Sequence, residues 1–175
     1  MAQDLGLNEF NKEKFKQVLH YIIAQCENID SAGKTVLFKI QYFSDFNFYE
    51  LFEEKMTGET YRRIDHGPAP MHFTQAVREL DDEGKIEYYN RDFYGMNQIK
   101  YKSLRSPDTS LLTQKEIEVI DSVIETHGCK NASEISDLSH LDVPYMATKD
   151  KCLIDYELVF YRDPITSVRV YGPDE

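Results

Sequence analysis

The stretch of residues 33–49 constrains the fold more than any other part of this sequence. Its apolar side chains fall on every side of a helix and not on one face; they are Val36, Leu37, Phe38, Ile40, Tyr42, Phe43, Phe46 and Phe48. A helix without a polar face is normally the buried centre of a bundle. We therefore expect a predominantly helical bundle around this buried central helix, with Asp30 or Ser31 as its N-terminal cap.

Further helices are predicted on both sides of the central one. Apolar residues recur at helical spacing over residues 11–28, 70–83, 113–128 and, in a shorter stretch, 133–140. Pro70 suits a first helical turn and Gly84 a left-handed cap at the end of the same helix. Thr113 and Glu116 have the spacing of a capping box.

A small β-hairpin is predicted within residues 86–104. Two β-prone pieces, 86–89 and 98–104, flank a polar stretch with Gly95 in the expected turn. Residues 61–65 are expected to be extended, and residues 66–70 cannot be helical because Pro68 and Pro70 fix φ. The predicted fold class is therefore α+β.

We expect a single domain over residues 1–175, with its core at 11–142. The structure of residues 143–175 is hard to derive from the pattern. Tyr156 and Phe160 have the spacing of a helix, whereas Val168 and Val170 alternate as in a strand.

Composition narrows the class of protein. The sequence has no apolar run of transmembrane length, and residues 1–11 lack the basic start and apolar stretch of a secretory signal. We therefore expect a cytoplasmic protein without a membrane partner. Cys26, Cys129 and Cys152 are odd in number and far apart, which disfavours a disulfide framework and a cysteine-built zinc site. They are expected to be buried as small hydrophobes.

No pattern in the sequence favours catalysis. Residues 32–35 (Ala-Gly-Lys-Thr) resemble the end of a P-loop, but Asn28 stands where the motif needs its first glycine. His66 and His72 flank the proline turn without further zinc ligands at a suitable spacing. His127 precedes a glycine at a predicted helix end, where a cation is favourable. We expect no enzyme, no catalytic residue, no metal and no cofactor.

Charge indicates the kind of partner. The net charge is −11, which attracts basic partners and repels phosphate backbones. Residues 85–105 depart from this balance, with five basic residues against two acidic ones, and aromatic residues lie among them. The candidate partner-binding residues here are Tyr88, Tyr89, Arg91, Phe93, Tyr94, Lys100, Tyr101 and Lys102.

Three interpretations of this segment remain open. Its aromatic side chains can pack on the core, or its Tyr and Arg residues can contact a protein, as they do at many interfaces. The acidity of the chain disfavours nucleic acid as a partner everywhere except at residues 85–105. The order helix, glycine, strand, turn, strand is also that of a winged helix.

An ordered set of motifs resembles one known family. Tyr42-Phe43-x-Asp45-Phe46, then Thr57-Gly58-x-x-Tyr61, then His66-Gly67-Pro68-x-Pro70, then Leu80-x-x-x-Gly84-x-Ile86 resemble the Panacea domain, also called the SocA-like antitoxin domain. Residues 113–123 and 131–140 are similar to its second half, so the likeness spans about residues 15–140. The ordered set is specific, whereas each piece by itself is weak.

The resemblance implies an antitoxin, prokaryotic or phage-associated, that neutralises a cognate toxin by direct binding. It also implies a link to an ATP-dependent protease, to which such proteins can deliver a toxin. A winged-helix-like DNA-binding regulator is the alternative. The motif residues implied to be structural are Tyr42, Phe43, Asp45, Phe46, Gly58, Tyr61, His66, Gly67, Pro68, Pro70 and Gly84. Asp45 and Tyr61 could equally support a contact, and His66 stands where an aromatic residue is expected.

Overall fold

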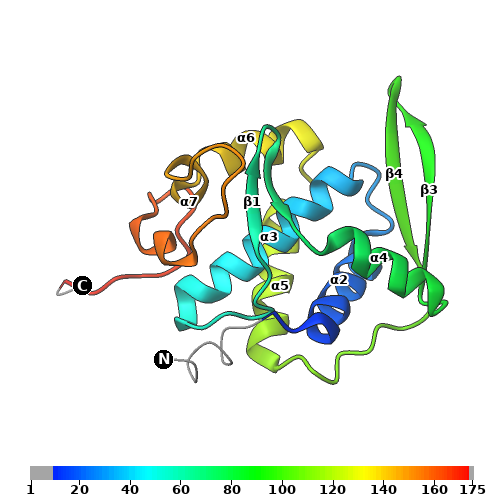
Figure 1. Cartoon of the computed structure of the whole chain (residues 1–175), viewed down its shortest axis with the longest axis horizontal. Coiled ribbons are helices and arrows are strands. Elements are labelled where there is room, and N and C mark those ends of the chain that lie inside the picture. Colours follow the sequence, from blue (N-terminus) through cyan, green and yellow to red (C-terminus); the bar gives the residue numbers. More distant parts are fainter. Residues whose placement is uncertain (1–9, 174–175) are drawn as a thin grey trace.

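Helices and two antiparallel hairpins follow one another along residues 10–173, the part of the chain that this computed structural model describes (Figure 1). The elements are α2 (Lys12–Cys26), α3 (Lys34–Phe52), β1 (Tyr61–Ile64), β2 (Gly67–Pro70), α4 (Phe73–Asp82), β3 (Ile86–Phe93), β4 (Met96–Ser103), α5 (Gln114–His127), α6 (Ala132–His140), α7 (Val143–Met146) and the 3-10 helix η1 (Tyr156–Tyr161). The class is α+β, as expected. Residues 1–9, on which the expectation about a secretory signal mainly rests, lie outside the described residues.

Helix α3 is buried on all sides over most of its length. Every residue from 40 to 50 is buried, and α2, α5, α6, η1 and the β1–β2 hairpin all contact this helix. Neighbouring elements on every side explain why its sequence has no solvent-facing polar stripe. The expected cap is wrong, because the helix starts at Gly33 without a side-chain cap hydrogen bond, and neither Asp30 nor Ser31 supplies one.

The proline-rich stretch forms a tight hairpin. Tyr61 pairs with Pro70 and Ile64 with Gly67, so Pro70 belongs to β2 and does not open α4, which begins at Phe73. Two prolines are tolerated because this sheet has just two strands and β2 is an edge strand. The predicted extended segment 61–65 is confirmed over Tyr61–Ile64 in β1, whereas Asp65 lies in the turn.

The second hairpin is longer than expected. Tyr94 and Gly95, at φ +51° and +81°, form its two-residue turn, so the strands include most of the expected turn region 90–97. Such a pair of positive φ values is typical of a type I′ turn. Because both faces of its outer half are largely exposed, the sequence there lacks the alternation that would reveal a strand. Figure 1 shows this hairpin standing at one end of the molecule.

The C-terminal segment lies at the other end, beside α7 (Figure 1). Residues 156–161 are helical, in agreement with the prediction, but residues 167–172 form no strand. The reason is visible at Glu50 of α3, whose carboxylate accepts hydrogen bonds from the Val168 backbone N–H at 3.0 Å and the Ser167 hydroxyl at 2.6 Å. A side chain thus takes the backbone donor that a strand would give to a neighbouring strand.

Two further expectations concern membranes and cysteines. Among the described residues, every helix is too short or too polar to cross a bilayer. Cys26 is buried as expected, but Cys129 and Cys152 are exposed, so the prediction of three buried thiols is wrong. Cys129 lies just beyond α5 and Cys152 in the loop between α7 and η1, both outside the apolar spacing that places Cys26 in the core.

Candidate partner-binding surface

Three motif residues meet in one buried hydrogen-bond network. The Asp45 carboxylate accepts bonds from the Thr57 backbone N–H at 3.2 Å, the Thr57 hydroxyl at 2.9 Å, and the Tyr61 hydroxyl. All three residues are at most 1 % exposed. Burial raises the pKa of Asp45 to about 6, against the opposing effect of these hydrogen bonds. Tyr61 therefore ties β1 to α3, which corrects its place among the candidate partner-binding residues.

A second hydrogen-bond network connects the loop between α3 and β1 to the start of α4. The buried Glu59 carboxylate accepts bonds from the His72 backbone N–H at 2.8 Å and the Thr60 backbone N–H at 2.8 Å, and it lies 2.6 Å from the His72 Nδ1. Phe10 stacks on the His72 ring, with the ring centroids 4.0 Å apart. Burial raises the pKa of Glu59. His72 thus has a structural role, whereas His66 is exposed in the turn between β1 and β2.

His127 does not act as the expected helix-capping cation. Its ring packs against Phe43, with the centroids 5.0 Å apart, and burial lowers its pKa to about 4. The imidazole is therefore neutral near pH 7.

Among the described residues, no group of three His, Cys, Asp or Glu side chains is placed to hold a metal ion.

Two of the candidate cations are used inside the molecule. Lys100, 4 % exposed, donates to the carbonyl oxygens of Ile29 and Ala32, the latter at 3.3 Å. Arg91 donates to the Asp30 carbonyl oxygen at 2.6 Å. These bonds fix the β3–β4 hairpin to the loop between α2 and α3. The expectation that Lys100 faces a partner is therefore wrong, and Arg91 is occupied by the same loop.

The remaining candidates divide between core and surface. Tyr101 is buried against Phe73, with its ring edge-on at 5.8 Å, so it does not face a partner. Lys102 on β4 is exposed, and Tyr88 and Tyr89 on β3 are each about half exposed. At the tip of the hairpin Phe93 is partly buried, whereas Tyr94 is 92 % exposed.

One exposed residue at the tip of the β3–β4 hairpin was not among the residues predicted from the sequence. Met96, 74 % exposed, directly follows the turn and pairs with Phe93. The signal that could have revealed it is an apolar side chain next to an expected glycine turn, where a polar residue is usual. Phe93, Tyr94 and Met96 together give the hairpin an apolar tip.

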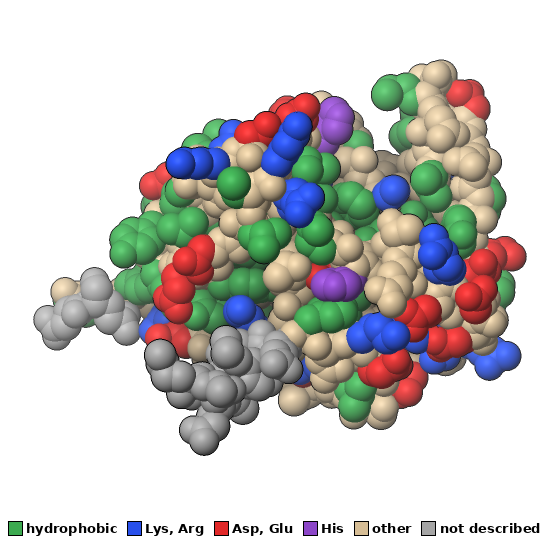
Figure 2. Space-filling view, in the orientation of Figure 1, with side chains coloured by type: hydrophobic (Ala, Val, Ile, Leu, Met, Phe, Trp, Pro, Cys, Tyr) green, Lys and Arg blue, Asp and Glu red, His purple; other side chains and the backbone are tan. Residues whose placement is uncertain are grey.

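The winged-helix order of elements is present, but the helix has the wrong charge. Helix α4, Gly84, β3 and β4 do follow one another. The exposed residues at the end of α4 include Asp81, Asp82 and Glu83 against one arginine, Arg78. Acidic side chains gather near this end of the molecule in Figure 2. A helix of that charge repels the phosphate backbone of DNA.

Comparison with known proteins gives one match. The family model described as antitoxin SocA-like, Panacea domain, matches residues 37–144, more than half of the chain. The protein belongs to this family, which confirms the resemblance seen in the motifs. The matched region starts within α3 and ends in α7, so it includes the Asp45–Tyr61 network and both hairpins. No curated protein and no solved structure matches the chain.

Proposed function

We propose that this protein is an antitoxin that neutralises a cognate toxin by direct, stoichiometric binding. The observation that carries the proposal is its membership of the SocA-like Panacea family over residues 37–144. The buried motif residues support it, because Asp45, Thr57 and Tyr61 satisfy one another inside the fold. Side chains that are used in this way hold a scaffold together and do not react with a substrate.

The surface supports the same proposal. An acidic chain with a net charge of −11 attracts a basic partner and accelerates the encounter. Exposed aromatic side chains, among them Tyr89 and Tyr94, then offer the contacts that dominate binding energy at protein interfaces. Electrostatic attraction thus brings the partner close, and apolar contact holds it.

The decisive experiment uses the neighbouring reading frame as the source of the toxin. Expressed by itself, its product should arrest growth, and co-expression of this chain should restore growth. The purified proteins should elute together, and toxin activity should fall linearly until the two are in a fixed, near-equimolar ratio. Neutralisation by catalytic amounts would show an enzyme instead. A shortened toxin half-life in cells would show delivery to a protease.

A further inference from the structure

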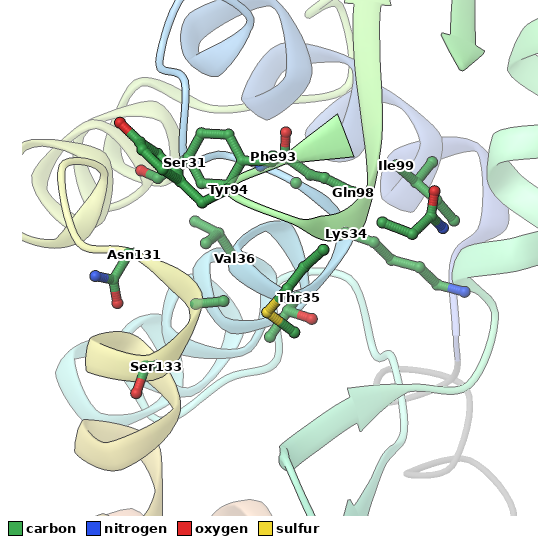
Figure 3. A pocket seen from close by; sticks show the side chains of 14 residues that line it. Ser31, Lys34, Thr35, Val36, Phe93, Tyr94, Gln98, Ile99, Asn131 and Ser133 are labelled. Atoms are coloured by element: carbon green, nitrogen blue, oxygen red, sulfur yellow. The ribbon is translucent and has the colours of Figure 1, made fainter. Parts of the chain in front are cut away.

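A pocket of about 450 Å³ opens between the tip of the β3–β4 hairpin and the first turns of α3 and α6. We call it the tip groove. Figure 3 shows Phe93 and Tyr94 on one side of it and Val36 on the other, with Asn131, which caps α6, and Ser133 of α6 at its edge. In Figure 2 the surface is hollowed between the hairpin and the rest of the molecule. The hairpin is held at this separation because Arg91 and Lys100 bond it to the loop before α3.

The walls of the tip groove are mostly apolar and lack acidic groups. Phe93, Tyr94, Met96 and Val36 contribute to its apolar surface. Of the described residues that line it, Lys34 is the only charged one, although the chain has 31 acidic residues. Helix α3 begins here without a side-chain cap, so its first backbone N–H groups add partial positive charge. The groove therefore favours an apolar group accompanied by a negative charge.

Tyr94 is held in a backbone conformation that a tyrosine rarely adopts. Its φ of +51° is left-handed, and asparagine, aspartate or glycine is usual at this position of a two-residue hairpin turn. The side chain is 92 % exposed, so packing within this chain contributes little to offset the cost. Unfavourable backbone geometry that carries an exposed aromatic ring is characteristic of contact sites.

We propose that the tip groove receives a segment of the toxin in which an apolar side chain lies next to a carboxylate. The apolar side chain packs between Tyr94, Met96 and Val36, and the carboxylate lies near Lys34 and the start of α3. This inference rests on the proposed function and specifies where, and by which chemistry, the toxin is held. The acidic remainder of the surface attracts the toxin as a whole, and the groove supplies the specific contact.

The test measures binding of the purified product of the neighbouring reading frame to the full chain by calorimetry. The double variant Tyr94→Ala, Met96→Ala should weaken the Kd at least tenfold, because these side chains supply the apolar wall. Lys34→Glu should weaken it by a similar factor. All three side chains lie at the surface or groove wall, and an acidic residue in the first turn of α3 suits the helix dipole. The variants should therefore keep the thermal unfolding midpoint of the wild type, which is checked in parallel.

A matched tyrosine variant provides the control. Tyr161→Ala removes a ring that is 72 % exposed on η1, outside the tip groove. This variant should bind the toxin like the wild type. If the groove variants bind normally, or if Tyr161→Ala is the weakened one, the groove is not the docking site.

Peptides that tile the toxin sequence identify the occupant. Those that bind should contain an apolar residue beside Asp, Glu or the C-terminal carboxylate, and should lose binding to the Lys34→Glu variant. If the tightest peptides are basic, the assigned chemistry is wrong. If wild-type chain does not bind the intact toxin at all, the proposed function itself fails, and this result is distinct from normal binding by the groove variants.

Discussion

Arg162 donates two hydrogen bonds to Asp142, at 2.8 Å from Nε to Oδ1 and 3.0 Å from Nη2 to Oδ2, and both side chains are fully buried. The same guanidinium donates to Glu50 at 3.0 Å and to Asn47 at 2.8 Å, both on α3. Asp142 also accepts the Tyr42 hydroxyl at 2.5 Å. Arg162 thus connects the segment that follows the family-matched region to the helix on which the family motif begins.

Removal of this arginine should destabilise the fold strongly. Arg162→Ala leaves the carboxylates of Asp142 and Glu50 buried without their cation, which typically costs about 3–5 kcal/mol of unfolding free energy. Urea denaturation monitored by circular dichroism measures the loss. Arg78→Ala, on the exposed face of α4, is the control and should change stability by about 0.5 kcal/mol or less. Equal effects of the two variants would show that the buried cluster contributes nothing.

Asp45 should make the stability fall as pH rises. Burial places the pKa of this carboxyl at about 6 in the folded chain, compared with about 3.9 in an unfolded one. Between these values the folded state holds a proton that the unfolded state has released, so unfolding free energy decreases from pH 4 to pH 6. The difference between the folded and unfolded pKa values of Asp45 corresponds to roughly 3 kcal/mol of unfolding free energy.

Asp45→Asn isolates this contribution because asparagine does not titrate. The stability of the wild type minus that of the variant should decrease by roughly 3 kcal/mol between pH 4 and pH 7. Urea titrations at several pH values provide the comparison. Other titrating groups, Glu59 among them, contribute equally to both proteins and cancel. A difference that stays constant with pH would mean that Asp45 keeps an ordinary pKa in the folded state.

Lys39 is a buried cation whose replacement should stabilise the protein. It is 1 % exposed and donates to the Pro68 carbonyl oxygen at 3.3 Å, and no carboxylate of the described residues forms an ion pair with it. Burial lowers the pKa of its ammonium to about 8. At pH 7 the folded chain therefore pays roughly 3 kcal/mol to keep the charge, and this penalty disappears as pH rises from 8 towards 10.5.

Lys39→Met keeps the length of the side chain and removes the charge. We expect it to raise the unfolding free energy at pH 7 by about 1–3 kcal/mol, less than the full penalty because the Pro68 carbonyl loses its donor. The gain should shrink at pH 10. Lys102→Met, at an exposed position, should show neither the gain nor its pH dependence. Destabilisation by Lys39→Met would indicate that the amine has a stronger partner than the Pro68 carbonyl.

The features that the sequence predicted correctly depend on residues close together in the chain. The capping box of Thr113 and Glu116 and the left-handed cap at Gly84 each involve neighbours within a few positions, so the residue types themselves reveal them. Arg162, in contrast, bonds to Glu50 across 112 positions. No local pattern indicates such a pairing, which is why the C-terminal segment could not be placed.

The candidate partner-binding residues show the same division. Lys100 has the chemistry of a surface cation, but its partners are backbone carbonyl groups at Ile29 and Ala32, which a sequence pattern does not reveal. Tyr94 was a candidate and is exposed, whereas Met96 was missed because it lay in an expected polar turn. Residue type thus pointed to a hairpin that carries exposed aromatic side chains, and the fixation of this hairpin to the α2–α3 loop decided which of its side chains remain accessible.

Gly67 should be far less replaceable than a second glycine at a hairpin turn. Its φ is +116°, and a Cβ there would lie 2.5 Å from both the Lys39 Cε and the Ser139 Oγ. Gly67→Ala therefore combines an unfavourable backbone conformation, about 1–2 kcal/mol, with overpacking of about 1–3 kcal/mol. Gly95→Ala shares the positive φ, +81°, but has no atom within 4 Å of the added methyl group. It should therefore lose only the backbone contribution of about 1–2 kcal/mol. Thermal and urea unfolding of both variants compare the two losses directly. If they were equal, the tip of the β1–β2 hairpin would not be packed against α3 and α6 as closely as the distances to Lys39 and Ser139 require.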